Sequence, residues 1–99
     1  MIEKLEKLVA AGIGLIPATE VTTHFIFQRD GFVALVERRG DGFGGIGASG
    51  LLTEKGGLAP LVWRGDQAFF VGRAFEQQAS DAEIAKLRAF SRDLSGAIS

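Results

Sequence analysis

The first apolar residues of the chain recur at the spacing of an amphipathic helix. The stripe consists of Ile2, Leu5, Leu8 and Val9. Gly12 and Gly14 then interrupt the pattern, and Pro17 prevents its continuation. The sequence therefore predicts a helix from about residue 2 to residue 11. Because a helix this short is marginal in water, it must pack against the rest of the chain.

From Val21 onward the pattern changes to the alternation of β-strands. Two extended runs, 21–28 and 32–39, flank Asp30-Gly31. A type I′ turn needs positive φ at both central residues, which Asp-Gly accommodates, so the sequence predicts a hairpin with this pair as its loop. The loop fixes the register, which places Phe27 opposite Ala34, Ile26 opposite Leu35, Phe25 opposite Val36 and His24 opposite Glu37.

The next segment, from Gly40 to Gly57, reads GDGFGGIGASGLLTEKGG. Glycine weakens the interior of a strand, so only a short third strand is predicted, from about Ile46 to Thr53. A turn at residues 54–57 follows it. The glycine-rich stretch from Gly40 to Gly50, which overlaps the start of this strand, is otherwise interpreted as a loop between strands.

A second hairpin is predicted after this segment. The runs 58–63 and 68–72 flank Gly65-Asp66, which fits the loop of a tight turn. The resulting register places Trp63 opposite Ala68, Val62 opposite Phe69 and Leu61 opposite Phe70. Both faces of this hairpin are apolar. We expect it to lie in the middle of the sheet, or to be covered on its second face by a partner.

The C-terminal segment carries the clearest helical signal. Ser80-Asp81-Ala82-Glu83 is a capping box, in which the Ser80 hydroxyl accepts from the amide of Glu83 and the Glu83 carboxylate reaches back. Gly96 is predicted to end the helix. The apolar stripe consists of Ile84, Leu87, Phe90 and Leu94, and it can extend to Ile98.

These elements predict an α+β fold for a single domain that spans residues 1–99. The fold is an antiparallel sheet of four to five strands with two hairpins, flanked by an N-terminal and a C-terminal helix on one face. If Phe25 and Phe27 point toward the helices, the other face of the first hairpin carries His24, Ile26, Leu35 and Glu37.

Composition removes several classes of function. The chain has 11 basic and 12 acidic residues, a balance that argues against a nucleic-acid partner. It has no cysteine, which excludes disulfides and thiolate chemistry. The apolar stretch from Leu8 to Ile16 is too short to span a bilayer, and Glu3 and Glu6 disfavour a signal peptide. We expect a cytoplasmic protein with no membrane partner and no cofactor.

The glycine-rich segment is a weak candidate for ligand binding. It matches the G-x-G-x-x-G pattern, but a dinucleotide site needs that pattern between a parallel strand and a helix. An anion-binding nest is the remaining possibility. It would consist of the amides of Gly44, Gly45 and Gly47, with Arg38 and Arg39 beside them. The plainer interpretation, a connecting loop with no ligand, is favoured.

His24 is the only histidine of the chain. Glu37, opposite it in the predicted register, could orient its ring, as general-base catalysis requires. No convincing nucleophile accompanies the pair, and no second histidine is present to share a metal ion. A polar cross-strand pair is therefore the favoured interpretation, and no catalytic or metal-binding residue is predicted.

The apolar fraction of 46% is high for a chain of 99 residues, and a domain of this size leaves much of its surface exposed. This favours a non-enzymatic protein that acts by association, as a homodimer or as a subunit or regulatory module bound to a protein partner. One alternative is a small-molecule or anion-binding module that uses residues 40–50. The other is an enzyme that uses His24 and Glu37. If the protein is a monomer, we expect an apolar surface or cavity near the glycine-rich segment.

Overall fold

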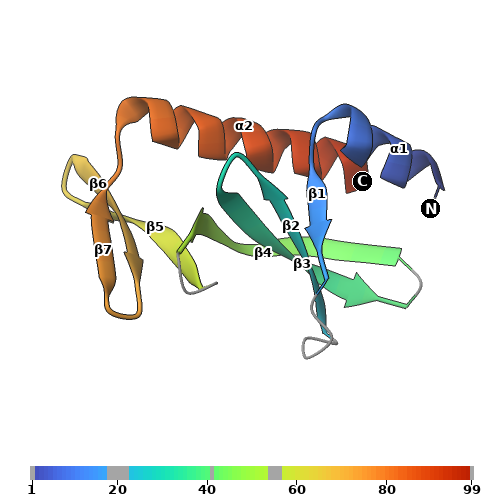
Figure 1. The fold of residues 1–99 in the computed structure, drawn as a ribbon, viewed down its shortest axis with the longest axis horizontal. Coiled ribbons are helices and arrows are strands. Elements are labelled where there is room, and N and C mark those ends of the chain that lie inside the picture. The colour runs from blue at the N-terminus through green and yellow to red at the C-terminus, as the bar shows by residue number, and fades with distance from the viewer. Residues whose placement is uncertain (1, 18–22, 41, 54–56, 99) are drawn as a thin grey trace.

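The computed structural model of the protein describes residues 2–17, 23–40, 42–53 and 57–98. Along the chain, one helix precedes the strands and a second helix follows them (Figure 1). The elements are α1 (Ile2–Ala10), β1 (Gly14–Ile16), β2 (His24–Arg29), β3 (Phe32–Arg39), β4 (Gly42–Leu52), β5 (Leu58–Arg64), β6 (Gln67–Gly72), β7 (Phe75–Gln78) and α2 (Asp81–Ile98).

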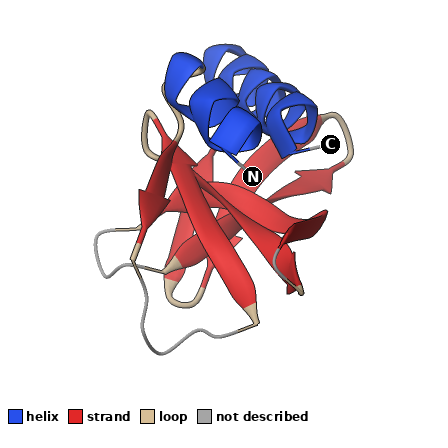
Figure 2. Cartoon of the chain, turned by 90° about the vertical axis from the view of Figure 1, so that its right-hand side faces the viewer, coloured by secondary structure: helices blue, strands red, loops and turns tan. Residues whose placement is uncertain are grey.

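The strands form one antiparallel meander in which each strand pairs with the next along the chain. The sheet is curled, and α2 runs along it from the β6–β7 end to α1 (Figure 1). Both helices lie on the same side of the sheet (Figure 2). The α+β class and the helices on one face are therefore confirmed.

The predicted number of strands is too low, because the sheet has seven. The additional strands are the two edges, β1 with three residues and β7 with four. Runs this short contain too few alternating positions to produce a recognisable strand pattern. They are defined by pairing with β2 and β6, which local sequence does not report.

The first hairpin has the predicted register at all four expected pairs. Asp30 and Gly31 have φ angles of 53° and 84°, the positive values that a type I′ turn requires. Phe25 and Phe27 face the helices and belong to the core or pack against it. Val21 and Thr22, at the start of the predicted run, lie outside the described residues.

The predicted third strand is present as β4, but it begins at Gly42 rather than at Ile46 and pairs along β3, so the prediction of a glycine-rich loop over residues 40–50 is wrong. The register against β3 shifts twice, between Ala34 and Val36 and again between Val36 and Arg38. At each shift β4 uses one residue more than β3, and such bulges bend a strand. The glycines therefore belong to a bent strand. Of the turn predicted at residues 54–57, residues 54–56 lie outside the described residues.

The second hairpin also has the predicted register. Neither of its strands is an edge of the sheet, because β4 and β7 flank them. On the face away from the helices, Arg64 lies over the ring of Phe69, with its guanidinium carbon 5.1 Å from the ring centre. Val62, on the same face, stays 38% exposed. The apolar outer face that the sequence predicts is thus only partly covered.

The capping box at the start of α2 is confirmed. The amide of Glu83 donates to the Ser80 hydroxyl at 3.1 Å, and the Glu83 carboxylate accepts from the Ser80 amide at 3.0 Å. The predicted end at Gly96 is wrong, because the helix continues to Ile98. Ala97 and Ile98 are both buried, and this packing outweighs the low helix propensity of one glycine.

Replacing Ser80 by alanine is expected to lower the free energy of unfolding by about 1 kcal/mol. The substitution removes the acceptor for the Glu83 amide and leaves the rest of the helix intact. Urea denaturation measures the change. Ser95→Ala is the matched control, because Ser95 is an exposed residue of the same helix far from the cap. Equal effects of the two substitutions would show that the cap contributes nothing specific.

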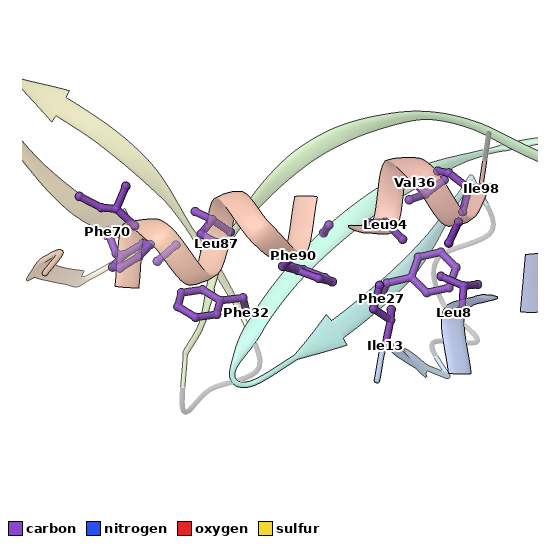
Figure 3. Close-up of a cluster of buried hydrophobic side chains, with 14 of the residues drawn as sticks. Leu8, Ile13, Phe27, Phe32, Val36, Phe70, Leu87, Phe90, Leu94 and Ile98 are labelled. Atoms are coloured by element: carbon purple, nitrogen blue, oxygen red, sulfur yellow. The ribbon is translucent and has the colours of Figure 1, made fainter. Parts of the chain in front are cut away.

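The core lies between α2 and the concave side of the sheet (Figure 3). Four of its large side chains are completely buried: Phe70, Phe90, Leu94 and Val36. Phe90 lies midway along the row of core side chains, between Phe70 at one end of α2 and Ile98 at the other (Figure 3). One helix therefore holds both ends of the curled sheet together.

Candidate functional site

An apolar groove lies between α1 and the sheet. It has a volume of about 480 Å³, and its lining consists of hydrophobic side chains and one glycine. The lining residues are Leu5, Leu8, Val9, Ile13, Gly14, Leu15, Phe25, Phe27 and Phe43. They come from α1, the segment after it, β1, β2 and β4, so the groove exists only when these elements are assembled.

The helix α1 forms one wall of the groove and ends in a Schellman motif. Gly12 has a φ of 73°, its amide donates to the carbonyl of Val9, and the amide of Ile13 donates to that of Leu8. Leu8 and Ile13, which this motif brings together, are buried. Leu5 and Val9 are 46% and 77% exposed and form the rim. Only part of the predicted apolar stripe therefore packs into the protein.

Arg29 of β2 fixes the end of α1 relative to the sheet and α2. Its guanidinium donates to the carbonyl of Ala11 at 3.1 Å and to the carboxylate of Asp93 at 2.9 Å. The hydrogen bond from Arg29 holds the pKa of the Asp93 carboxyl below its ordinary value of 3.8. Asp93 is therefore charged at neutral pH, and the contact that anchors this wall of the groove is an ion pair.

Three phenylalanines form the floor of the groove. Phe25 and Phe27 are alternate residues of β2, so they share a face of the sheet, and Phe43 comes from β4. The ring centres are 5.1 Å apart for Phe25 and Phe43, and 5.8 Å apart for Phe27 and Phe43. Their planes meet at 67° and 66°, the edge-to-face arrangement that aromatic rings favour.

A smaller hollow of about 130 Å³ adjoins the groove, and Leu15 and Phe25 line both. His24 and Arg38 add polar groups to this hollow. The Arg38 guanidinium lies over the Phe25 ring, with its central carbon 4.4 Å from the ring centre. The apolar groove therefore ends at a cationic side chain.

The structure does not bring the predicted anion-binding residues together. Gly44, Gly45 and Gly47 are part of β4, and none of them has the positive φ that a nest of amides uses. Arg38 and Arg39 are consecutive residues of β3, so their side chains point to opposite faces. Anion binding by this set stays a prediction, but its residues surround no common point.

His24 and Glu37 are cross-strand partners, as the register predicts. Their polar contacts lie elsewhere: the His24 ring nitrogen Nδ1 is 2.9 Å from the Thr23 hydroxyl, and Arg39 donates to the Glu37 carboxylate at 3.4 Å. The structure therefore brings the pair together on the sheet without a hydrogen bond between the two side chains among its described contacts. Catalysis by this pair stays a prediction.

Sequence reasoning expected an apolar surface or cavity near the glycine-rich segment but did not identify the residues of the groove, although two signals for them are present. The apolar stripe of α1 is too wide for all of its side chains to pack against the protein, so Leu5 and Val9 stay exposed. Phe43 is the one aromatic residue in the glycine-rich segment, where glycine neighbours provide no side chains to cover it. Neither signal says that the two regions meet.

The structure is that of a small α+β protein with an apolar groove between α1 and the sheet. No protein-family model, curated protein or solved structure matches the chain. No helix in the described residues is long and apolar enough to cross a membrane.

Proposed function

We propose that this protein is a binding module whose groove holds a small ligand with an apolar body. The observation that carries the proposal is the groove of about 480 Å³ with its apolar lining. Small-molecule sites are concave, mostly apolar, and about 300–1,000 Å³ in volume. The aromatic floor offers flat apolar surfaces to such a ligand, and burial of its apolar area would drive binding.

The shape of this surface favours a small ligand over a second protein. A stable protein–protein interface buries roughly 800 Å² on each partner and involves roughly 20–30 residues a side. The exposed rim of the groove has three large hydrophobic side chains: Leu5, Val9 and Leu15. The interior of the groove, rather than its rim, therefore provides most of the apolar surface that a ligand can contact.

The proposal is tested with N-phenyl-1-naphthylamine, an uncharged dye whose fluorescence rises in apolar surroundings. We expect saturable binding of one dye per chain. Leu15→Gln is expected to weaken it about fivefold, because an amide in the groove wall loses water on binding without gaining a partner. Leu15 is 53% exposed, so the substitution leaves the core intact.

Val62→Gln is the matched control for Leu15→Gln. It places the same side chain at an exposed hydrophobic position of β5, outside the groove. The control is expected to bind the dye as the unmodified protein does. Dye fluorescence that does not saturate, or an equal loss in both variants, would contradict the proposal.

Self-association, which the composition favours, is the second candidate function. The observation in its favour is Val9, which leaves 77% of its surface in water beside the exposed Leu5 and Leu15. Two copies related by a twofold axis could cover these residues mutually. Light scattering across a dilution series measures the mass, and a dimer that Leu15→Gln dissociates would support this candidate. A mass of one chain at every concentration would refute it.

A further inference from the structure

The groove ends at the positive charge of Arg38, which could recognise a charged group on a ligand whose apolar part lies in the groove. Arg38 lies on the same face of β3 as Val36, which is buried beneath the helices, so it belongs to the groove side of the sheet. Its guanidinium stacks on Phe25, and Phe25 lines both the groove and the adjoining hollow. A ligand that lies along the floor would therefore reach this charge.

The stacked guanidinium remains able to bind an anion. Its N–H groups lie in its own plane, so an arginine over a ring keeps them available to a carboxylate. Among the described residues, no carboxylate lies within ion-pair distance of Arg38. Arg39, its neighbour in sequence, is already paired with Glu37 on the opposite face. Arg38 is thus a positioned positive charge at the edge of an apolar site.

We propose that the ligand is an amphipathic acid, with its apolar body in the groove and its anionic head on the Arg38 guanidinium. This inference rests on the proposed function and adds the chemical class of the ligand. Charge complementarity selects an anionic head over a neutral or cationic one, and a guanidinium binds a carboxylate through parallel hydrogen bonds. His24 also lines the adjoining hollow.

The acid is a free molecule with one apolar chain rather than a lipid within a membrane. The groove and the hollow, about 480 Å³ and 130 Å³, meet at Leu15 and Phe25, which line both. Such a site suits one drug-sized ligand, whose surface is largely buried on binding. Anionic vesicles that bind the protein while the soluble acid does not would overturn this assignment.

Displacement of the bound dye by three ligands with the same chain tests the head. The ligands are decanoate, 1-decanol and decylammonium, each below the concentration at which it forms micelles or a separate phase. Decanoate is expected to displace the dye at about fivefold lower concentration than decanol, and decylammonium to be the weakest. Equal displacement by all three would overturn the acid proposal and leave the groove proposal standing. Failure of the dye itself to bind would overturn both.

Substitution of the two neighbouring arginines assigns the head to one residue. Arg38→Gln is expected to remove the preference for decanoate over decanol, which is measured as a ratio within the same variant. Arg39→Gln makes the same change of charge on the opposite face and is expected to keep the preference. Arg38→Lys retains the positive charge but loses the planar guanidinium, so it should keep part of the preference for decanoate. Loss of the preference in Arg39→Gln, or its survival in Arg38→Gln, would overturn the assignment.

Discussion

Replacing Gly50 by alanine is expected to lower the free energy of unfolding by about 3 kcal/mol, through overpacking. A Cβ atom at this position would collide with the carbonyl oxygen of Ala59, and it would lie 2.7 Å from two further backbone atoms of β5. These are backbone atoms of the paired strand, so no side-chain rotation relieves the contact. The two strands would have to separate where β4 pairs with β5. Urea or thermal denaturation measures the loss.

Gly45→Ala is the matched control for this substitution. Gly45 is an exposed residue of the same strand, and a Cβ atom there would meet no atom within 4 Å. Because glycine costs more backbone entropy than alanine in a strand, this change is expected to raise stability by about 0.5 kcal/mol. Similar losses in the two variants would show that flexibility along β4, rather than close approach at Gly50, determines the effect.

Much of the fold follows from local signals in the sequence. Asp30-Gly31 and Gly65-Asp66 set the registers of two hairpins, because each turn admits only one pairing of its flanking residues. Ser80 and Glu83 mark the start of α2 by a reciprocal hydrogen bond between near neighbours. In each case the interacting residues are close in sequence, which is why the pattern alone identifies them.

The features that the sequence did not reveal depend on distant residues. From the sequence alone, Gly50 is only a residue that weakens a strand. The structure shows that the carbonyl of Ala59 lies too close for any side chain at this position. Gly96 looks like a helix stop, yet burial of Ile98 against the core continues the helix. The penalty of a glycine is local, whereas the packing that compensates for it comes from other elements, so the local pattern gives the wrong answer.

The groove is the strongest example of this limit. Its wall α1 is held in place by Arg29, which reaches the carbonyl of Ala11 and the carboxylate of Asp93. Its floor combines Phe25 with Phe43, two strands apart in the sheet. The sequence suggested an apolar surface near the glycine-rich segment, and Phe43 does line the groove. Without the tertiary contacts, that surface could not be assigned to particular residues.

Replacing Phe90 by alanine is expected to cost about 3–5 kcal/mol, a large part of the stability of a protein of this size. Phe90 is completely buried, and it lies midway along the row of core side chains that α2 shares with the sheet (Figure 3). Its ring also lies beneath Arg29, with the guanidinium carbon 5.6 Å from the ring centre. The substitution therefore leaves a cavity in the core and loosens the contact that anchors α1.

Two further variants test whether this loss comes from the cavity. Phe90→Leu removes less volume and is expected to cost about 1–2 kcal/mol, whereas Arg88→Ala, at an exposed position of the same helix, should change stability by less than about 0.5 kcal/mol. Denaturation in urea ranks the three. If leucine costs as much as alanine, the shape of the ring matters rather than the volume it fills. If Arg88→Ala costs as much, the helix itself, and not its packing, limits stability.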